Sequence, residues 1–198
     1  MFRDIYALCD MGLLRRFGLG LEDFVKIAKL FNAEIMQYRD KEGSVEEKNE
    51  NLKKLRAMWD GTLIVNDEFA LARFCDGVHV GQEDLLDIIE AFGARSKAEA
   101  VTILRKLSGA KIVGLSTHSE EEIEEANGLE LDYIGLGAYR ATSTKDVEHI
   151  LGPKLEILAL KSTHKVVAIG GVRVFDPIAN VWKRAIGTDL VIKALTYA

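Results

Sequence analysis

The amino-acid sequence predicts a compact (β/α)8 barrel, the TIM-barrel class of α/β fold, built as a single domain over residues 1–198. Short β-branched or apolar runs alternate with amphipathic helical patterns, which predicts parallel strands joined by helical crossovers. Eight such runs are present, and eight parallel strands close a barrel of this class. The length of 198 residues suits one such domain near its lower size limit. An open doubly wound sheet is the alternative.

The eight expected strands are short apolar segments that end in turn or polar residues. They cover residues 5–10, 34–40, 62–67, 77–81, 111–118, 133–137, 166–171 and 189–197. Because the last run ends next to residue 198, we expect the barrel to lack its closing eighth helix.

Helical patterns separate most of these strands. One covers residues 20–31, a second covers 44–59 and a third covers 119–128, and the last two begin with capping-box spacings at Ser44/Glu47 and Ser119/Glu122. Two further helical segments are expected between residues 84 and 111. Residues 138–154 show no helical pattern, so we expect a mobile loop that acts as a lid.

Composition narrows the classes of partner. The net charge of -5 comes without a basic block, which argues against nucleic-acid and membrane partners and favours small-molecule ligands. Two cysteines, Cys9 and Cys75, are too few for a disulfide framework, so a reducing cytoplasm is expected. The N-terminus has no long apolar segment, and no apolar run is long enough to span a membrane.

The second strand ends in several polar side chains, within the stretch "MQYRDK". Alternation along a strand puts Gln37, Arg39 and Lys41 on one side, with Tyr38 and Asp40 on the other. Barrel active sites form at the carboxyl ends of the strands, and Arg with Lys there suits a phosphate ligand. The alternative is a surface cluster paired with helix carboxylates.

Carboxylates follow the third and fourth strands. Asn66 and Asp67 end the third strand, and Gln82, Glu83 and Asp84 come just past the fourth, so the second carboxylate is that of Glu83 or Asp84. Two carboxylates near phosphate-binding cations predict a Mg²⁺ site, since Mg²⁺ commonly takes one or two protein carboxylates together with substrate phosphates. The alternative is that these acidic residues cap the following helices.

Ser116 and His118 end the fifth strand. A single histidine after a strand is more often structural than catalytic, and these two residues do not make a nucleophilic triad.

Two later segments suit phosphate groups. The loop "ATSTK" supplies Thr142, Thr144 and Lys145, whose hydroxyls and ammonium group are typical phosphate ligands, although an ordinary solvated loop is the alternative. Gly170 and Gly171 end the seventh strand, where barrel phosphate sites commonly use backbone N–H groups. They could instead only permit a tight turn.

Six segments in order carry a family resemblance: "MQYRDK", "IVND", "GVHVGQEDL", "GLSTHS", "TSTK" and "AIGG". With them the chain resembles the thiamine phosphate synthase family over nearly its full length. The resemblance implies a transferase that joins hydroxymethylpyrimidine diphosphate to a thiazole phosphate and releases pyrophosphate. It implies that Mg²⁺ is the cofactor.

The resemblance also implies roles for individual residues. Gln37, Arg39, Lys41 and Asn66 would hold the pyrimidine diphosphate, and Asp67 and Asp84 would bind Mg²⁺. Ser116, Thr142, Thr144 and Lys145 would line the pyrophosphate and thiazole region, with Ser116 and Lys145 as the catalytic residues, and Gly171 would meet the thiazole phosphate. The chemistry needs a stabilised leaving group and a positioned thiazole nitrogen but no protein nucleophile.

Two departures from the family pattern stand out. Ala138 and Ala141 occupy positions where the family usually has proline, which predicts a looser loop, and Leu195 stands at about the place of a phosphate-binding serine. The missing serine and the short C-terminus suggest one alternative function, a non-catalytic barrel that binds a thiamine precursor. A second alternative is a related thiazole tautomerase, which shares much of the strand-end pattern and for which His118 would be the acid or base. The expected lack of a closing helix further predicts a homodimer, with the contact near strand eight.

Overall fold

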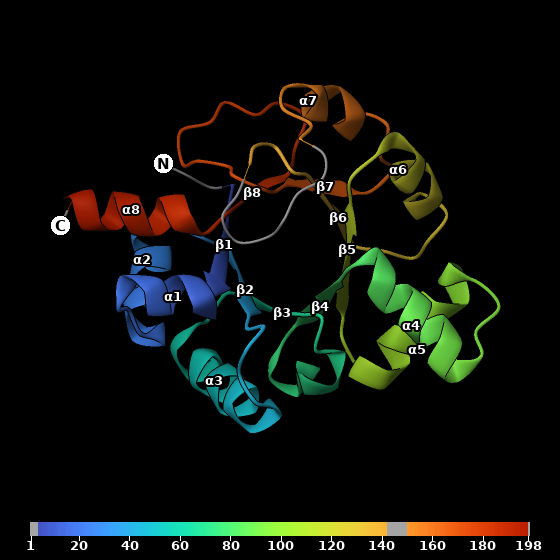
Figure 1. Cartoon of the computed structure of the whole chain (residues 1–198), viewed down its shortest axis with the longest axis horizontal. Helices are drawn as coiled ribbons and strands as arrows, with labels where there is room; N and C mark the ends of the chain where they lie inside the picture. The colour runs from blue at the N-terminus through green and yellow to red at the C-terminus, as the bar shows by residue number, and fades with distance from the viewer. Residues whose placement is uncertain (1–3, 142–149, 198) are drawn as a thin grey trace.

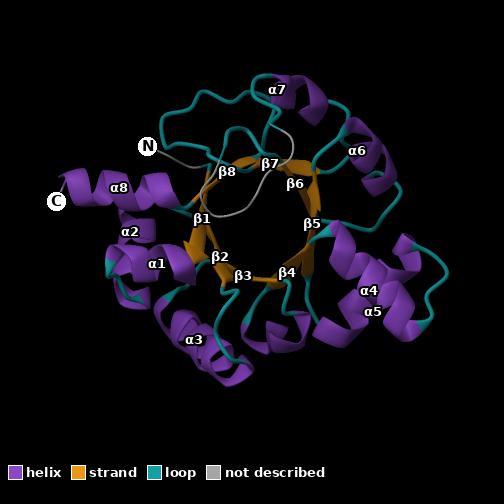
Figure 2. Ribbon diagram, in the orientation of Figure 1, coloured by secondary structure: helices purple, strands orange, loops and turns teal. Residues whose placement is uncertain are grey.

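A computed structural model describes residues 4–141 and 150–197, and within them eight parallel strands close into a barrel (Figures 1 and 2). Each strand pairs with the next, and β8 pairs with β1, so the (β/α)8 fold class is confirmed. The strands are β1 (Ile5–Asp10), β2 (Ile35–Arg39), β3 (Thr62–Asn66), β4 (Gly77–Val80), β5 (Ile112–Thr117), β6 (Tyr133–Leu136), β7 (Lys165–Ala168) and β8 (Lys183–Ile186).

Helices surround the barrel (Figure 2). They are α1 (Met11–Phe17), α2 (Leu21–Leu30), α3 (Val45–Met58), the 3-10 helix η1 (Phe69–Phe74), α4 (Gln82–Phe92), α5 (Lys97–Ser108), α6 (Glu120–Ala126), α7 (Lys154–Ala159) and α8 (Thr188–Tyr197). The helices expected at 20–31, 44–59 and 119–128 and the pair after residue 84 are confirmed as α2, α3, α6, α4 and α5. In the described part of the chain, no helix is both long and apolar enough to cross a bilayer.

The expected capping boxes are formed in one case and altered in the other. At α3, the Ser44 hydroxyl accepts the Glu47 N–H at 3.2 Å, and the Glu47 carboxylate accepts the Ser44 N–H at 2.8 Å. At α6, Ser119 accepts the Glu122 N–H at 3.2 Å, but the Glu122 carboxylate accepts the N–H of His118 at 2.6 Å. Glu122 therefore fixes the backbone at the end of β5 rather than its own helix cap.

Apolar side chains form two separate clusters, because successive residues of a strand point to opposite faces of the sheet. The larger cluster lies between the strands and the helices. The smaller cluster fills the barrel interior and consists of Tyr6, Ile35, Ile64, Tyr133, Val167 and Ala185, with Leu8, Ile112 and Ile169 packed against it. Two of its members are tyrosines, so the interior contains hydroxyl groups that need hydrogen-bonding partners.

The prediction of a strand at residues 189–197 is wrong, because this segment is part of the helix α8. Leu190, Val191 and Ala194 are buried, whereas Ile192 and Leu195 are exposed, which is the spacing of a helix with one apolar face. The closing helix is thus present, and it lies beside α2 (Figure 1). The reason given for a homodimer, a missing closing helix, is therefore absent, because α8 packs against α2, whose flank was expected to be open. The homodimer itself stays an untested prediction.

The true eighth strand has two basic residues, and both are buried. Lys183 forms an ion pair with Glu34. Arg184 binds Asp4 through two hydrogen bonds of 2.6 and 2.9 Å and donates to the carbonyl of Val174 at 2.8 Å. Residues 169–182, which connect β7 to β8, contain no helix in the structure, and the Arg184 guanidinium lies against the carbonyls of this segment instead.

The loop expected at 138–154 is only partly described, because residues 142–149 lie outside the described ranges. Its described ends are held by backbone hydrogen bonds. The Leu151 N–H donates to the Ala138 carbonyl at 2.8 Å, and the Arg140 N–H donates to the Gly170 carbonyl at 2.8 Å. The predicted looseness of the loop concerns mainly residues 142–149, which lie outside the described residues, so it stays a prediction.

Candidate active site

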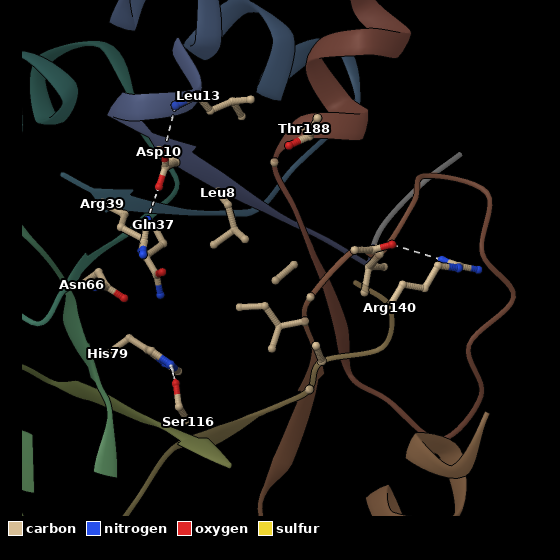
Figure 3. Close-up of a pocket in the computed structure, with 18 of the residues that line it drawn as sticks. Leu8, Asp10, Leu13, Gln37, Arg39, Asn66, His79, Ser116, Arg140 and Thr188 are labelled. Carbon is tan, nitrogen blue, oxygen red and sulfur yellow. Dashed lines mark hydrogen bonds and ion pairs between the residues drawn. The ribbon is translucent and has the colours of Figure 1, made fainter. Parts of the chain in front are cut away.

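A pocket of about 1410 Å³ opens at the carboxyl ends of the strands (Figure 3). Residues from the ends of all eight strands or the loops that follow them line it. Among the residues predicted from the sequence, those that line the pocket are Gln37, Arg39, Lys41, Asn66, Asp67, Asp84, Ser116, His118, Gly170 and Gly171. Thr142, Thr144 and Lys145 lie outside the described residues.

Strand β2 places its polar residues as alternation predicts. The Gln37 side chain is buried and lines the pocket together with Arg39 and the exposed Lys41. Tyr38 points to the other side, where its hydroxyl donates to Asp40 at 3.2 Å and accepts from Asn51 at 3.1 Å.

Asp10 orients Arg39, and the sequence reasoning missed this residue. It ends β1 directly opposite Arg39 in the strand register. One oxygen of its carboxylate accepts the Leu13 N–H at 2.8 Å at the start of α1, and the other forms an ion pair with Arg39. The available signal was its position, since Asp10 ends the first strand as Arg39 ends the second.

The carboxylates of Asp67 and Asp84 lie close enough for their charges to interact. Burial raises the pKa of Asp67 to about 6, the negative charge of Asp84 adds to this increase, and Arg39 and Lys41 oppose it. Asp84 also accepts the N–H of Gly81 at 2.6 Å, so its expected capping role is real as well. Asp67 makes no such cap, and its backbone has a positive φ of 62°.

This pair suits a hard divalent cation. Burial is the main cause of the raised pKa of Asp67, and a cation between the two carboxylates would offset both the lost hydration and the repulsion from Asp84. Within residues 4–141 and 150–197, no group of three or more His, Cys, Asp or Glu side chains gathers at a metal-binding distance. Two carboxylates alone fit Mg²⁺ better than a metal with a full set of protein ligands, because Mg²⁺ keeps water and takes substrate phosphates.

Ser116 and His118 occupy different hydrogen-bonding environments. The Ser116 hydroxyl lies 3.0 Å from Nε2 of His79, a buried residue of β4 that sequence reasoning passed over. Nδ1 of His118 lies 2.8 Å from the carbonyl of Gly137. A carbonyl only accepts, so Nδ1 of His118 carries a proton, and Nε2 is the nitrogen that remains for other partners.

The two glycines after β7 bring the backbone close to the neighbouring loop. Gly170 and Gly171 have φ values of 83° and 64°, in the left-handed region that favours glycine. A Cβ atom on Gly171 would lie 2.8 Å from the carbonyl oxygen of Ala141 and 2.8 Å from Cβ of Arg140. A side chain at position 171 therefore has no room.

Leu195 was expected at the end of strand eight, at about the place of a phosphate-binding serine, and this expectation is wrong. Leu195 lies on α8 and is 54% exposed, so it does not follow the eighth strand as predicted. Strand β8 ends at Ile186, and the residues that follow, Gly187 and Thr188, line the pocket. Figure 3 shows Thr188 at the start of α8. The misplaced strand caused this error.

Arg140 lines the pocket near the loops that follow β6 and β7, and it was not predicted as a site residue from the sequence. Its guanidinium binds the Asp176 carboxylate, with an Nη2–Oδ1 distance of 2.9 Å, and donates to the carbonyl of Gly171 at 3.1 Å. It also stacks on the Tyr139 ring at 4.6 Å. Arg140 thus joins the loop after β6 to the loop after β7.

Comparison with known proteins places the chain among enzymes of one kind. The sequence pattern of the thiamine monophosphate synthase family matches residues 6–195. The thiamine-phosphate synthase of Persephonella marina is 35% identical over 175 residues, which cover 85% of this chain and 76% of the relative. That of Pelotomaculum thermopropionicum is 37% identical over 191 residues, which cover 91% of this chain and 79% of the relative.

A solved structure supports the fold independently. The thiamine phosphate pyrophosphorylase of Pyrococcus furiosus superposes with a TM-score of 0.71, covering 98% of this chain and 96% of that chain at 22% sequence identity. At this identity the likeness concerns the fold alone. The family pattern and the curated relatives, which are transferases, carry the assignment: the chain belongs to the thiamine monophosphate synthase family.

Proposed function

We propose that this chain joins hydroxymethylpyrimidine diphosphate to a thiazole phosphate and releases pyrophosphate, which gives thiamine phosphate. One observation carries the proposal beyond family membership. The cations Arg39 and Lys41 and the carboxylates Asp67 and Asp84 interact electrostatically at one wall of the pocket. Such a wall suits a diphosphate together with a divalent cation.

The pyrimidine diphosphate would bind along strands β2 and β3. Arg39, oriented by Asp10, offers a planar fork to phosphate oxygens, and the exposed Lys41 offers a mobile point charge. Gln37 and Asn66 offer amide groups to the ring and the diphosphate. Asp67 and Asp84 would hold Mg²⁺, which when bound would neutralise charge on the diphosphate.

The reaction itself needs little covalent chemistry from the protein. The bond between the pyrimidine methylene carbon and the diphosphate oxygen breaks, and pyrophosphate leaves with the electron pair. The thiazole nitrogen then forms a bond to that carbon. The protein would stabilise the leaving group through Arg39 and Lys41 and hold both rings in line. Ser116 and Lys145 are the proposed catalytic residues at the pyrophosphate, together with Thr142 and Thr144 as ligands.

The thiazole phosphate would bind at the opposite wall, between the ends of β7 and β8. Gly171 has no room for a side chain and brings its backbone to the pocket. Thr188, the first residue of α8, adds a hydroxyl just after the eighth strand, the region where the family resemblance leads us to expect a phosphate-binding serine. Backbone N–H groups of the loops after strands seven and eight commonly hold phosphate in this fold.

Product analysis tests the proposal. The protein is incubated with both substrates and Mg²⁺, and pyrophosphate and thiamine phosphate are measured. A thiazole tautomerase, for which His118 in the pocket would exchange a proton, would release no pyrophosphate. A binding barrel without activity would give neither product, so either result would exclude the synthase.

A matched pair of variants then links activity to the pocket. Arg39→Lys keeps the charge but loses the fork, so kcat/KM should fall by about tenfold or more with little change in Tm. The control is Arg15→Lys, because Arg15 also pairs with a carboxylate, that of Asp40, but does not line the pocket. Equal kinetic effects of the two changes, or a large loss of stability in Arg39→Lys alone, would show that Arg39 has a structural role.

We further propose that the protein works in a reducing compartment, as the cytoplasm is. Cys9 and Cys75 are both free thiols in the structure. Burial raises the pKa of Cys75 to about 12, so its reactive thiolate form is rare at neutral pH.

A further inference from the structure

A chain of hydrogen bonds crosses the barrel interior beneath the pocket. Nε2 of Gln37 donates to the Tyr6 hydroxyl at 2.8 Å, which lies 2.9 Å from the Tyr133 hydroxyl. The Tyr133 hydroxyl lies 2.9 Å from Nδ1 of His79, and Nε2 of His79 lies 3.0 Å from the Ser116 hydroxyl. We call these five residues the interior relay; Figure 3 shows its two pocket-facing ends, Gln37 and Ser116.

The interior relay is enclosed by the barrel. Its members Tyr6, Gln37, Tyr133 and His79 are each at most 4% exposed. Glycines make the room that it needs: a Cβ atom on Gly114 would lie 2.2 Å from Cζ of Tyr133 and 2.6 Å from Nδ1 of His79. The barrel therefore leaves out a side chain at this position, where the Tyr133 and His79 side chains meet.

Hydrogen counting gives the relay a direction. Burial raises the pKa of both phenols, so Tyr6 and Tyr133 each keep one hydrogen to donate. Because Tyr6 accepts from the Gln37 amide, its own hydrogen goes to Tyr133, and that of Tyr133 goes to Nδ1 of His79. His79 then carries its proton on Nε2 and donates to Ser116.

This direction decides what the two ends offer to a ligand. The Ser116 hydroxyl already accepts from His79, so its hydrogen is free to be donated into the pocket. In the described part of the chain, every fully buried polar side-chain atom has a hydrogen-bonding partner. Oε1 of Gln37 has no such partner among the described residues. It follows that Oε1 is accessible, as an acceptor on the pocket wall.

We propose that Tyr6, Tyr133 and His79 are positioning residues that set substrate specificity by holding Gln37 as an acceptor and Ser116 as a donor toward the pocket. The ring recognised at Gln37 must then carry a hydrogen-bond donor, such as the exocyclic amine of an aminopyrimidine, and Ser116 suits a phosphate oxygen. This inference rests on the proposed function for the identity of the ring.

The opposite direction would reverse both ends. If the Gln37 amide turned over, its oxygen would accept from Tyr6, and every later hydrogen would move the other way. His79 would then carry its proton on Nδ1, Gln37 would offer only N–H groups, and Ser116 would donate inward to His79. The two arrangements therefore differ in one measurable property, the tautomer of His79.

The first test is the tautomer of His79 in the ligand-free protein, read by long-range proton–nitrogen NMR correlations and assigned with His79→Gln. The proposal requires neutral imidazole with the proton on Nε2. A proton on Nδ1, or an imidazolium ring at pH 7, would overturn it. This measurement needs no catalytic activity, so it stands even if the proposed function fails.

The second test cuts the relay at one oxygen atom with Tyr6→Phe. For the wild type and for Tyr6→Phe, kcat/KM is measured with the aminopyrimidine diphosphate and with an analogue whose exocyclic amine is replaced by an oxo group. The ratio of the two kcat/KM values is the preference for the amine. Once the Gln37 amide is free to turn, the preference for the amine should fall by about tenfold, the equivalent of one hydrogen bond.

The matched control is Tyr38→Phe. Tyr38 is also buried, but its hydroxyl binds Asp40 and Asn51 outside the barrel interior. A purely structural effect would lower both kcat/KM values together and would do so in either variant. An unchanged preference in Tyr6→Phe, or an equal loss in Tyr38→Phe, would refute the specificity role. If Tyr6→Phe does not fold, Tyr133→Phe is used for the same comparison.

Discussion

Replacing Asp67 with asparagine should stabilise the metal-free protein while it abolishes Mg²⁺-dependent activity. In the folded chain the Asp67 carboxylate is desolvated and faces the charge of Asp84. Asparagine has nearly the same size, carries no charge, and tolerates the positive φ of 62° at this position. The substitution therefore removes the repulsion without a new strain.

The size of the effect follows from linkage. The pKa of Asp67 rises from 3.8 to about 6 on folding, and each unit corresponds to about 1.4 kcal/mol, which gives about 3 kcal/mol. Asp67 is partly exposed, so solvent screening reduces this figure to about 2 kcal/mol. Between pH values of about 4 and 6 the folded state binds more protons than the unfolded state, so stability falls as the pH rises. Above a pH of about 6, the folded protein has lost the whole of this stability, about 2 kcal/mol.

Urea unfolding with a metal chelator, followed by tryptophan fluorescence, measures this difference. At pH 8, Asp67→Asn should be more stable than the wild type by about 2 kcal/mol, and near pH 4 the two should agree. Adding Mg²⁺ should stabilise the wild type more than the variant. The control is Asp87→Asn, an exposed residue of α4 that does not line the pocket. If Asp67→Asn were less stable than the wild type at pH 8 without metal, the repulsion argument would be wrong.

Other residues give separate predictions. Thr188→Ala should raise KM for the thiazole phosphate by about tenfold and leave KM for the pyrimidine diphosphate unchanged, whereas Thr188→Ser should restore it; a change in both constants would contradict the assigned subsite. Gly171→Ala should raise the same KM and cost about 1 kcal/mol or more, because the new Cβ meets the Ala141 carbonyl at 2.8 Å; wild-type kinetics would show that the loop yields freely. Arg184→Met should lower the free energy of unfolding by about 3 kcal/mol, since Asp4 and the nearby carbonyls lose their partner, and a loss below about 1 kcal/mol in urea titration would show that solvent replaces it.

The pocket wall at β2 could be predicted because it depends only on local rules. Alternation along one strand separates Gln37 and Arg39 from Tyr38, and the barrel class puts strand ends at one rim. These statements need no knowledge of distant contacts. The same rules could not predict that Asp10 orients Arg39, because the pairing of β1 with β2 must be known first.

Strand β8 was missed for a different reason. Its first two residues, Lys183 and Arg184, are typical of an exposed segment, and they are buried only because Glu34 and Asp4 neutralise them. These partners lie 149 and 180 residues away in the sequence. The β-branched residues of α8 offered a local pattern that resembles a strand, and the intervals between its buried residues were the signal for a helix.

The interior relay shows the same limit at the site. Tyr6, Tyr133 and His79 look like ordinary core residues in their strands, and a histidine in an apolar run is usually structural. Their hydroxyls and ring meet only when the barrel closes, since Tyr6 and Tyr133 are 127 residues apart. A glycine such as Gly114 in a strand was the one local sign that something bulky approaches the backbone there.

The charges at the two ends of the barrel differ in how they are balanced. Those where the strands begin are paired within the folded protein, whereas those at the carboxyl ends need a ligand. At the end where the strands begin, Lys183 is buried and paired with Glu34. The interior relay in the middle is polar but neutral in the direction that hydrogen counting gives it. At the carboxyl end, the repulsion between Asp67 and Asp84 is left in place by folding. A divalent cation would remove this repulsion, and a phosphate ligand would complete the coordination of that cation, so ligand binding should stabilise the protein through the carboxyl end alone. Neutralising Lys183 should then lower the free energy of unfolding by the same amount with and without ligand. Asp67→Asn should instead change the increase in the free energy of unfolding that ligand binding produces.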